Sequence, residues 1–271
     1  MPTLLFHVDA FTRTPFRGNP AAVVVLDDFR DDAWLAAVAR EMNVSETAFA
    51  IPAGDGTFAL RWFTPTTEVP LCGHATLAAA AVLLGEGVTQ QKVVFQTVSG
   101  LLSVERLGNA YAMSLPAYRV EAAESTAIVA ALGVVPVDVW ISRESRDLVV
   151  RVADEAAVLA AKPRSADLLA ADNPLDVTGV IVTAEGAKSA PSPAPNFVSR
   201  YFAPWVGIDE DPVTGSAHAS LGPFWAERLG KKRLLAAQRS ARGGDLGVEI
   251  AGDRVILTGS CVVLSRGVWV A

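Results

Sequence analysis

One stretch of the chain occurs twice, and this duplication constrains the fold more than any other feature. Residues 61–84 read RWFTPTTEVPLCGHATLAAAAVLL, and residues 200–225 read RYFAPWVGIDEDPVTGSAHASLGPFW. The matched residues are Arg61, Phe63 and Pro65 with Arg200, Phe202 and Pro204, then Glu68, Pro70, Gly73 and Ala75 with Glu210, Pro212, Gly215 and Ala217. The second copy carries three extra residues in its loop. A repeat of this length predicts two similar halves.

Each copy predicts a strand, a turn and then an apolar helix. The helix expected at residues 75–84 has no charged side chain, and a helix that is apolar all round is a buried helix. Its N-terminus leaves backbone N–H groups free beside Gly73 and His74, and the second copy presents Gly215 and Ser216 in the same way. If the two N-termini converge, they form a site for an anion, most simply a substrate carboxylate.

A structural duplication without an active site is the alternative interpretation of this repeat. The turns of the two copies carry Cys72, His74, Asp211, Thr214 and Ser216 in place of plain turn residues. These side chains can bind or transfer protons, so they favour a functional site.

Composition excludes several classes of protein. The chain has 271 residues, of which 51% are hydrophobic and 19% charged, as in an ordinary globular protein with a large core. A net charge of −6 argues against nucleic acid or an anionic membrane as the main partner. With only Cys72 and Cys261, the chain is no disulfide framework, and the N-terminal residues lack a signal-peptide pattern. We therefore expect a cytoplasmic protein.

The periodicity of the chain predicts an α+β fold, in which two strand-rich halves each wrap around a central apolar helix. One half spans residues 1–117 and is completed by the last strand, 262–271; the other spans residues 118–261. Strands are expected at residues 4–10, 21–26, 46–51, 58–63, 92–97, 101–106, 111–115, 137–142, 147–152, 177–183, 246–250, 254–258 and 261–270. Further helices are expected at residues 31–42, 125–132 and 154–160, and a kink or break at Gly222-Pro223.

A carboxylate is the strongest candidate for proton transfer. Glu46 opens a strand with apolar neighbours, a setting that suits a general acid or base, although a solvated turn residue is the simpler reading. His74 follows a glycine at a helix N-terminus, which favours a neutral imidazole. Asp211 and Ser216 flank the second helix start, where capping is the ordinary role. Asn19 is either a loop-shaping residue or a substrate contact.

Cys72 suggests a second mechanism, because a helix N-terminus lowers the pKa of a thiol. Cofactor-independent racemases use two opposed thiols, one from each half. The repeat partner of Cys72 is Thr214, which cannot act as an equivalent base, so the repeat disfavours that chemistry. A zinc site built from the three histidines has no supporting spacing, and we expect no metal.

The motifs FHVDAFTRTPFRGNPAAVV, NVSETAF, RWFTPTTEVPLCGHAT, QTVSG and RYFAPWVGIDEDPVTGSAH together resemble the PhzF-like family, named for the phenazine-biosynthesis isomerase. They run in order along nearly the whole chain. The resemblance implies a diaminopimelate-epimerase-like fold: two pseudo-symmetric halves, each a curved mixed β-sheet around a central helix, with the site between them. It also implies a homodimer that needs no cofactor and acts on a small carboxylate-bearing substrate.

The resemblance assigns a role to each matched residue. Glu46 corresponds to the general acid/base, and His74, Asp211 and Ser216 correspond to residues that hold and polarise substrate. Gly73, Gly215, Asn19, Cys72 and Thr214 are expected to line the substrate site. The implied reaction is a hydrogen shift in which one carboxylate takes a proton from one carbon of an unsaturated ring and returns one to another.

The motifs do not identify the substrate. Pocket selectivity is expected in the less patterned loops at residues 12–17 and 186–196. Two alternatives remain open: a racemase or epimerase that uses Cys72, and a non-catalytic member of the family that binds a small acid or a protein.

Overall fold

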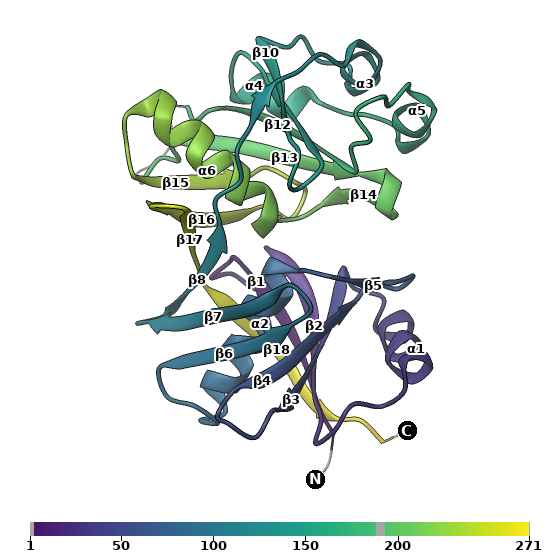
Figure 1. Cartoon of the computed structure of the whole chain (residues 1–271), viewed down its shortest axis with the longest axis vertical. Helices are drawn as coiled ribbons and strands as arrows, with labels where there is room; N and C mark the ends of the chain where they lie inside the picture. The colour runs from purple at the N-terminus through teal and green to yellow at the C-terminus, as the bar shows by residue number, and fades with distance from the viewer. Residues whose placement is uncertain (1–2, 188–192, 271) are drawn as a thin grey trace. The chain divides into compact units, whose positions relative to one another are not determined.

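The computed structural model describes residues 3–187 and 193–270, which form two compact units (Figure 1). Unit 1 comprises Met1–Leu115 and Leu257–Ala271, and unit 2 comprises Pro116–Ile256. Each unit is a mixed β-sheet with helices packed on it, which confirms the α+β class. Part of the loop predicted at residues 186–196 lies outside the described residues.

Unit 1 is a sheet around helix α2. Its strands are β1 (Leu4–Ala10), β2 (Asn19–Val25), β3 (Glu46–Pro52), β4 (Phe58–Phe63), β5 (Glu68–Val69), β6 (Lys92–Thr97), β7 (Gly100–Leu107), β8 (Ala110–Pro116) and β18 (Cys261–Val268), and its helices are α1 (Asp32–Met42) and α2 (Gly73–Gly85). The sheet runs from β18 through β1, β2, β3, β4, β6 and β7 to β8.

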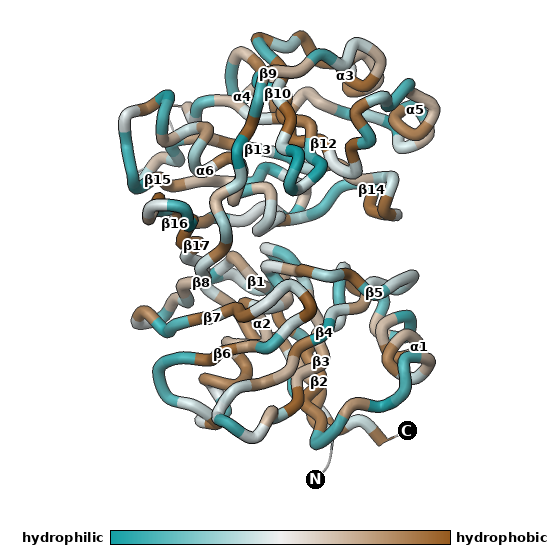
Figure 2. Tube along the Cα trace, viewed as in Figure 1, coloured by the Kyte–Doolittle hydropathy of each residue, from teal (hydrophilic) through white to brown (hydrophobic). Residues whose placement is uncertain are grey.

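Helix α2 is the core of unit 1. Every residue from Gly73 to Leu84 is buried, as its charge-free sequence predicts. The helix packs against β1, β2, β3, β6, β7 and β18. Hydrophobic residues also follow the strands beneath it, β2 and β3 in particular (Figure 2). Asp31 is the N-cap of helix α1, since its carboxylate accepts a hydrogen bond from the backbone N–H of Trp34 at 2.8 Å.

Unit 2 has the same layout around helix α6. Its strands are β9 (Glu121–Ala122), β10 (Asp138–Ser142), β11 (Asp147–Arg151), β12 (Gly179–Glu185), β13 (Phe197–Ala203), β14 (Ile208–Asp211), β15 (Arg233–Gln238) and β16 (Gly244–Ala251), and β17 (Arg254–Gly259) spans the return to unit 1. Its helices are α3 (Thr126–Leu132), α4 (Glu155–Ala160), α5 (Ser165–Ala170), the 3-10 turn η1 (Pro204–Val206) and α6 (Gly215–Leu229).

The strand pairings of unit 1 recur in unit 2. The series β1, β2, β3, β4, β6 and β7 pairs antiparallel, parallel, antiparallel, parallel and antiparallel. The series β10, β11, β12, β13, β15 and β16 has the same alternation. The duplication seen in 25 or so residues of sequence therefore extends over the sheet of each unit.

A matched ion pair closes the turn in both copies of the repeat. Arg61 donates from Nε and Nη2 to the two carboxylate oxygens of Glu68, each at 2.7 Å. Arg200 donates in the same two-pronged way to Glu210, at 2.7 and 2.9 Å. The three extra residues of the second copy lie between Arg200 and Glu210 and are accommodated there by η1 and β14. This bidentate geometry explains why both Arg and Glu are shared by the two copies.

Helix α6 continues through Pro223, so the break considered for Gly222-Pro223 does not occur. Proline lacks the N–H that would bond to the carbonyl of Ala219. The backbone N–H of Tyr118 donates to that carbonyl instead, at 3.1 Å. A partner from outside the helix therefore satisfies the group that Pro223 leaves free. No helix among residues 3–187 and 193–270 is long and apolar enough to span a membrane.

A buried carboxylate lies where β11 pairs with β12. Asp147 is 1% exposed, and its Oδ1 accepts a hydrogen bond from the hydroxyl of Tyr201 at 2.9 Å. Gly179 pairs with Asp147, and a Cβ atom on Gly179 would lie 2.1 Å from the Tyr201 hydroxyl and 2.4 Å from Asp147 Oδ1. Only glycine leaves room for this hydrogen bond. Burial raises the pKa of Asp147 to about 6, although hydrogen bonds from Ser145 and Tyr201 act in the opposite direction.

Replacing Gly179 by alanine tests this packing. We expect Gly179→Ala to lower the free energy of unfolding by about 1–3 kcal/mol, because the added methyl group overlaps Tyr201 and Asp147. Gly267→Ala is the matched control, since it also lies in a strand but nothing lies within 4 Å of its added Cβ. Urea unfolding of both variants measures the difference. Equal stability of the two variants would contradict the packing described.

The raised pKa of Asp147 makes a prediction about stability against pH. Between the ordinary carboxyl pKa and a pH of about 6, Asp147 holds its proton more often in the folded protein than in the unfolded chain. The free energy of unfolding therefore falls as pH rises through that window. Asp147→Asn should remove this pH dependence. Its free energy of unfolding should rise by up to about 3 kcal/mol relative to that of wild type as pH increases from 4 to 7. Denaturant unfolding at several pH values checks it, and parallel curves for the two proteins would refute it.

Candidate active site

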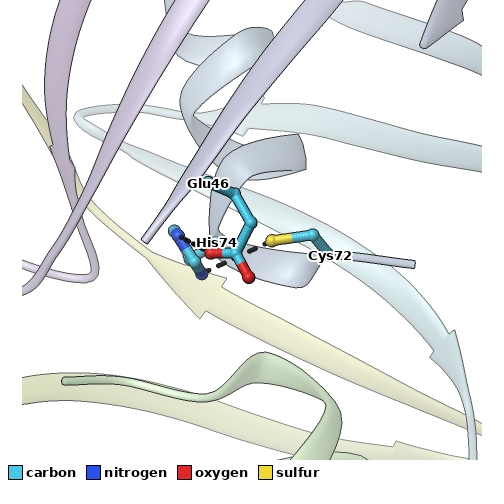
Figure 3. Close-up of side chains that lie close together, drawn as sticks. All are labelled: Glu46, Cys72 and His74. Atoms are coloured by element: carbon cyan, nitrogen blue, oxygen red, sulfur yellow. Dashed lines mark hydrogen bonds and ion pairs between the residues drawn. The ribbon is translucent and has the colours of Figure 1, made fainter. Parts of the chain in front are cut away.

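Three chemically distinct side chains converge in unit 1, at the start of helix α2. Glu46 begins β3, Cys72 is the N-cap residue of α2, and His74 lies in the first turn of the helix. All three are buried, with 7%, 6% and 3% of Glu46, Cys72 and His74 exposed. The carboxylate and the thiol both point toward the His74 ring (Figure 3).

The local fold explains why these residues meet. Strands β2 and β3 are parallel, and Ala21 pairs with Glu46, so Asn19 and Glu46 lie at the same end of the sheet. Helix α2 packs across these strands. Its first turn therefore delivers Cys72 and His74 to the strand end that carries Asn19 and Glu46.

Both nitrogens of the His74 ring have neighbours. Its Nε2 lies 3.1 Å from Glu46 Oε2, within ion-pair distance. Its Nδ1 lies 3.0 Å from Asn19 Nδ2 and 3.5 Å from Cys72 Sγ. Apart from this ion-pair contact, neither Nε2 nor Oε2 has a hydrogen-bond partner within the part of the chain that the structure describes. Four of the predicted site residues thus form one cluster.

The thiol of Cys72 is less acidic than its place in the sequence predicts. Complete burial and the neighbouring Glu46 carboxylate raise the pKa of Cys72 to about 11, and the favourable effect of His74 is smaller. The expectation that the helix N-terminus lowers this pKa is wrong, because desolvation of the thiolate outweighs the helix dipole.

The imidazole of His74 also differs from expectation. Burial opposes its positive charge, but the negative charges that Cys72 and Glu46 can carry raise the pKa of His74 well above the ordinary value. The Glu46 carboxylate, 3.1 Å from Nε2, is one of the two groups that favour the imidazolium. The predicted neutral imidazole is therefore disfavoured, because the sequence pattern did not show that a carboxylate faces the ring.

The matching turn of unit 2 forms a different polar cluster. The Thr214 hydroxyl donates to the Asp211 carboxylate, and Gly215 and Ser216 begin α6. Gln238, on β15, donates from Nε2 to the carbonyl of Asp211 at 2.7 Å and accepts from the backbone N–H of Thr214 at 2.9 Å. Gln238 could not be singled out from the sequence, where it is one amide at the end of an apolar run.

His218 stands where the first copy has Thr76, and both side chains bond to an N-cap carbonyl. Thr76 donates to the carbonyl of Cys72 at 2.6 Å, and His218 donates from Nδ1 to that of Thr214 at 2.7 Å. Burial lowers the pKa of His218 to about 4, so this imidazole is neutral. Its role in the structure is to hold the first turn of α6.

The register of the sheets shows that the two units do not carry the same chemistry. Phe63 pairs with Thr47 and Phe202 pairs with Val180, so the position that matches Glu46 is Gly179. A buried carboxylate next to a histidine at the helix start is therefore a feature of unit 1.

A metal ion also has potential ligands in this cluster. Among residues 3–187 and 193–270, one group of three side chains brings together His, Cys, Asp or Glu donors suited to a metal, and it consists of Glu46, Cys72 and His74. One ligand atom from each residue lies within 4.8 Å of the others.

Comparison with known proteins finds the phenazine biosynthesis-like protein family (PhzC-PhzF) over residues 8–267. An uncharacterized isomerase of Pseudomonas aeruginosa is 46% identical over 98% of both chains. A PhzF-family phenazine biosynthesis protein of Enterococcus faecalis, known by crystal structure, has a TM-score of 0.90 and 38% identity over 100% of both chains. A predicted epimerase of Pseudomonas aeruginosa shares the fold, with a TM-score of 0.72 at 21% identity over 100% of both chains.

The contact between Glu46 and His74 can be tested by titration. We expect Glu46→Gln to lower the pKa of His74, because the substitution removes the anion that stabilises the imidazolium. Proton NMR of the histidine rings measures the shift, and His218, with its pKa of about 4, is an internal control. An unchanged titration of His74 would show that Glu46 does not act on the ring.

Proposed function

Because the chain belongs to the phenazine biosynthesis-like family, we propose that it is a cofactor-independent isomerase that uses Glu46 to shift a proton within a small carboxylated metabolite. The relatives named as isomerases support the reaction class. The observation that carries the proposal is the buried Glu46 carboxylate, 3.1 Å from His74 Nε2 at the start of the buried helix α2. Unsaturated cyclic amino or hydroxy acids are the proposed substrates.

One carboxylate is sufficient for both steps of this reaction. Glu46 takes a proton from one carbon of the substrate, and the electron pair delocalises into the conjugated system and the carboxylate. The protonated Glu46 then returns a proton to another carbon, which moves the double bond without net oxidation or reduction. His74 orients the carboxylate and stabilises its charged form between the steps.

The start of helix α2 is suited to the substrate's own carboxylate. The first N–H groups of a helix have no partner within the helix, and the positive end of its dipole lies there. We assign the backbone of Gly73 and His74 this role, with Asn19 and Cys72 beside it. Stabilisation of negative charge that develops on the substrate would lower the barrier to proton removal.

Asp211 and Ser216, with Thr214 and Gly215, are further proposed substrate residues, on the basis of the family motif EDPVTGSAH. Asp211 is held by Thr214 and, through its carbonyl, by Gln238. Asp211→Asn and Ser216→Ala should each lower kcat/KM while the fold is retained.

We also propose that the protein is a cytoplasmic homodimer, and sedimentation would measure the dimer.

Cys72 as the base of a racemase is the weaker candidate. A thiol with a pKa of about 11 holds its proton at neutral pH and is a poor base there. Its partner in the repeat is Thr214, and the position that matches Glu46 is Gly179, so unit 2 offers no second base at the matched positions.

Deuterium wash-in separates these mechanisms. Wild type, Glu46→Gln and Cys72→Ser are incubated in heavy water with cyclic unsaturated amino and hydroxy acids and with ordinary amino acids, and proton NMR follows exchange. We expect Glu46→Gln to lose about 10²–10⁴-fold in rate, because the group that transfers the proton is gone. Glu105→Gln, a carboxylate of β7 paired with Lys92, is the matched control and should exchange like wild type.

Other outcomes would reject the proposal. Exchange that is lost in Cys72→Ser but retained in Glu46→Gln would indicate a racemase. Ligand-induced thermal stabilisation without exchange of any tested acid would indicate a binding protein.

A further inference from the structure

We propose that Glu46, Cys72 and His74 form a binding site for a soft or borderline divalent cation such as Zn²⁺, and that occupancy of this site inhibits the enzyme. Binding of the cation is argued from unit 1 alone. The inhibition rests on the proposed function, since it requires Glu46 to be the proton-transferring group.

The donor set indicates the type of ion. A carboxylate oxygen, a thiolate sulfur and an imidazole nitrogen are the ligands typical of Zn²⁺ and Co²⁺, whereas Mg²⁺ and Ca²⁺ prefer oxygen alone. With Glu46 and Cys72 ionised, the set carries two negative charges, which match a divalent cation. Three protein ligands leave a fourth position open in a tetrahedral site.

The distances are close to those of such a site. Ligand atoms around a tetrahedral Zn²⁺ lie about 3.3–3.7 Å apart, given bonds of about 2.0–2.3 Å. One ion binds only one nitrogen of His74: Nδ1 lies 3.5 Å from Cys72 Sγ, and Nε2 lies 3.1 Å from Glu46 Oε2. One ligand atom from each residue lies within 4.8 Å of the others, so the proposed site forms when Cys72 or Glu46 rotates toward the nitrogen that the other contacts.

Two atoms of the cluster point to an additional ligand. Glu46 Oε2 and His74 Nε2 are buried and have no hydrogen-bond partner among the residues that the structure describes. Leaving such polar atoms without a bond is costly, and a cation between them would satisfy both.

Occupancy would stop proton transfer for a simple reason. The Cys72 thiol loses its proton to solvent as the Cys72 sulfur–metal bond forms. Glu46 then donates an electron pair to the cation and can no longer accept a proton from substrate. No oxidation or reduction takes part in this step.

Cobalt is a direct probe of the ligand set. Metal-free protein is titrated with Co²⁺, and the near-ultraviolet absorption that arises when thiolate sulfur binds Co²⁺ is recorded, followed by competition with Zn²⁺. We expect wild type and Cys261→Ser to show this absorption and Cys72→Ser to lose it, since Cys261 is the other free cysteine and lies on β18. Glu46→Gln should weaken Co²⁺ binding at least tenfold.

The outcomes decide between the two parts of the proposal. Absence of the thiolate absorption in wild type, or its persistence in Cys72→Ser, would overturn the metal site. If Cys72→Ser does not fold, the Glu46→Gln variant decides. The metal site would be overturned if this variant keeps the thiolate absorption and binds Co²⁺ as tightly as wild type. Zn²⁺ should stop deuterium exchange by wild type and Cys261→Ser, and chelator should restore it. If no exchange occurs at all, the proposed function fails, while the cobalt spectrum still tests the site.

Discussion

Burial of helix α2 on all sides by the strands of unit 1 is the interaction on which the site depends. The helix has no charged residue, and Gly73 through Leu84 are all buried, so it has a single environment available to it. Burial of its N-terminus places the first N–H groups of the helix, a thiol and an imidazole at the end of β2 and β3. The cost of holding polar groups there is offset by the apolar surface that the rest of the helix removes from water.

The duplication preserved the scaffold and changed the chemistry. Both copies keep an arginine that clamps a glutamate with two hydrogen bonds, and both keep a side chain that bonds to the N-cap carbonyl of the central helix. The residues that face the helix start differ. Glu46 corresponds to Gly179, whose missing side chain makes room for Tyr201 and Asp147. The carboxylate that faces the start of the central helix in unit 1 therefore has no counterpart at the matched position of unit 2.

The electrostatics of the site follow from mutual proximity. Glu46 favours a charged His74 and disfavours a charged Cys72, and burial strengthens both effects because water does not screen them. The same three groups that suit proton transfer also provide the oxygen, sulfur and nitrogen donors of a metal site. Catalysis and inhibition by a cation would therefore depend on one set of contacts.

The repeat, the buried helix and strands such as Leu4–Ala10 and Phe58–Phe63 could be predicted from the sequence, because they depend on local pattern and period. It also indicated Glu46 and His74 through a family motif. It did not predict β15, since Arg233–Gln238 follows a helix and reads as its end. Three findings required the folded structure. They are the contact between Glu46 and His74, the raised pKa values of Cys72 and His74, and the hydrogen bonds by which Gln238 and Tyr118 hold α6. Each of these depends on atoms far apart in the chain, and local pattern carries no record of them.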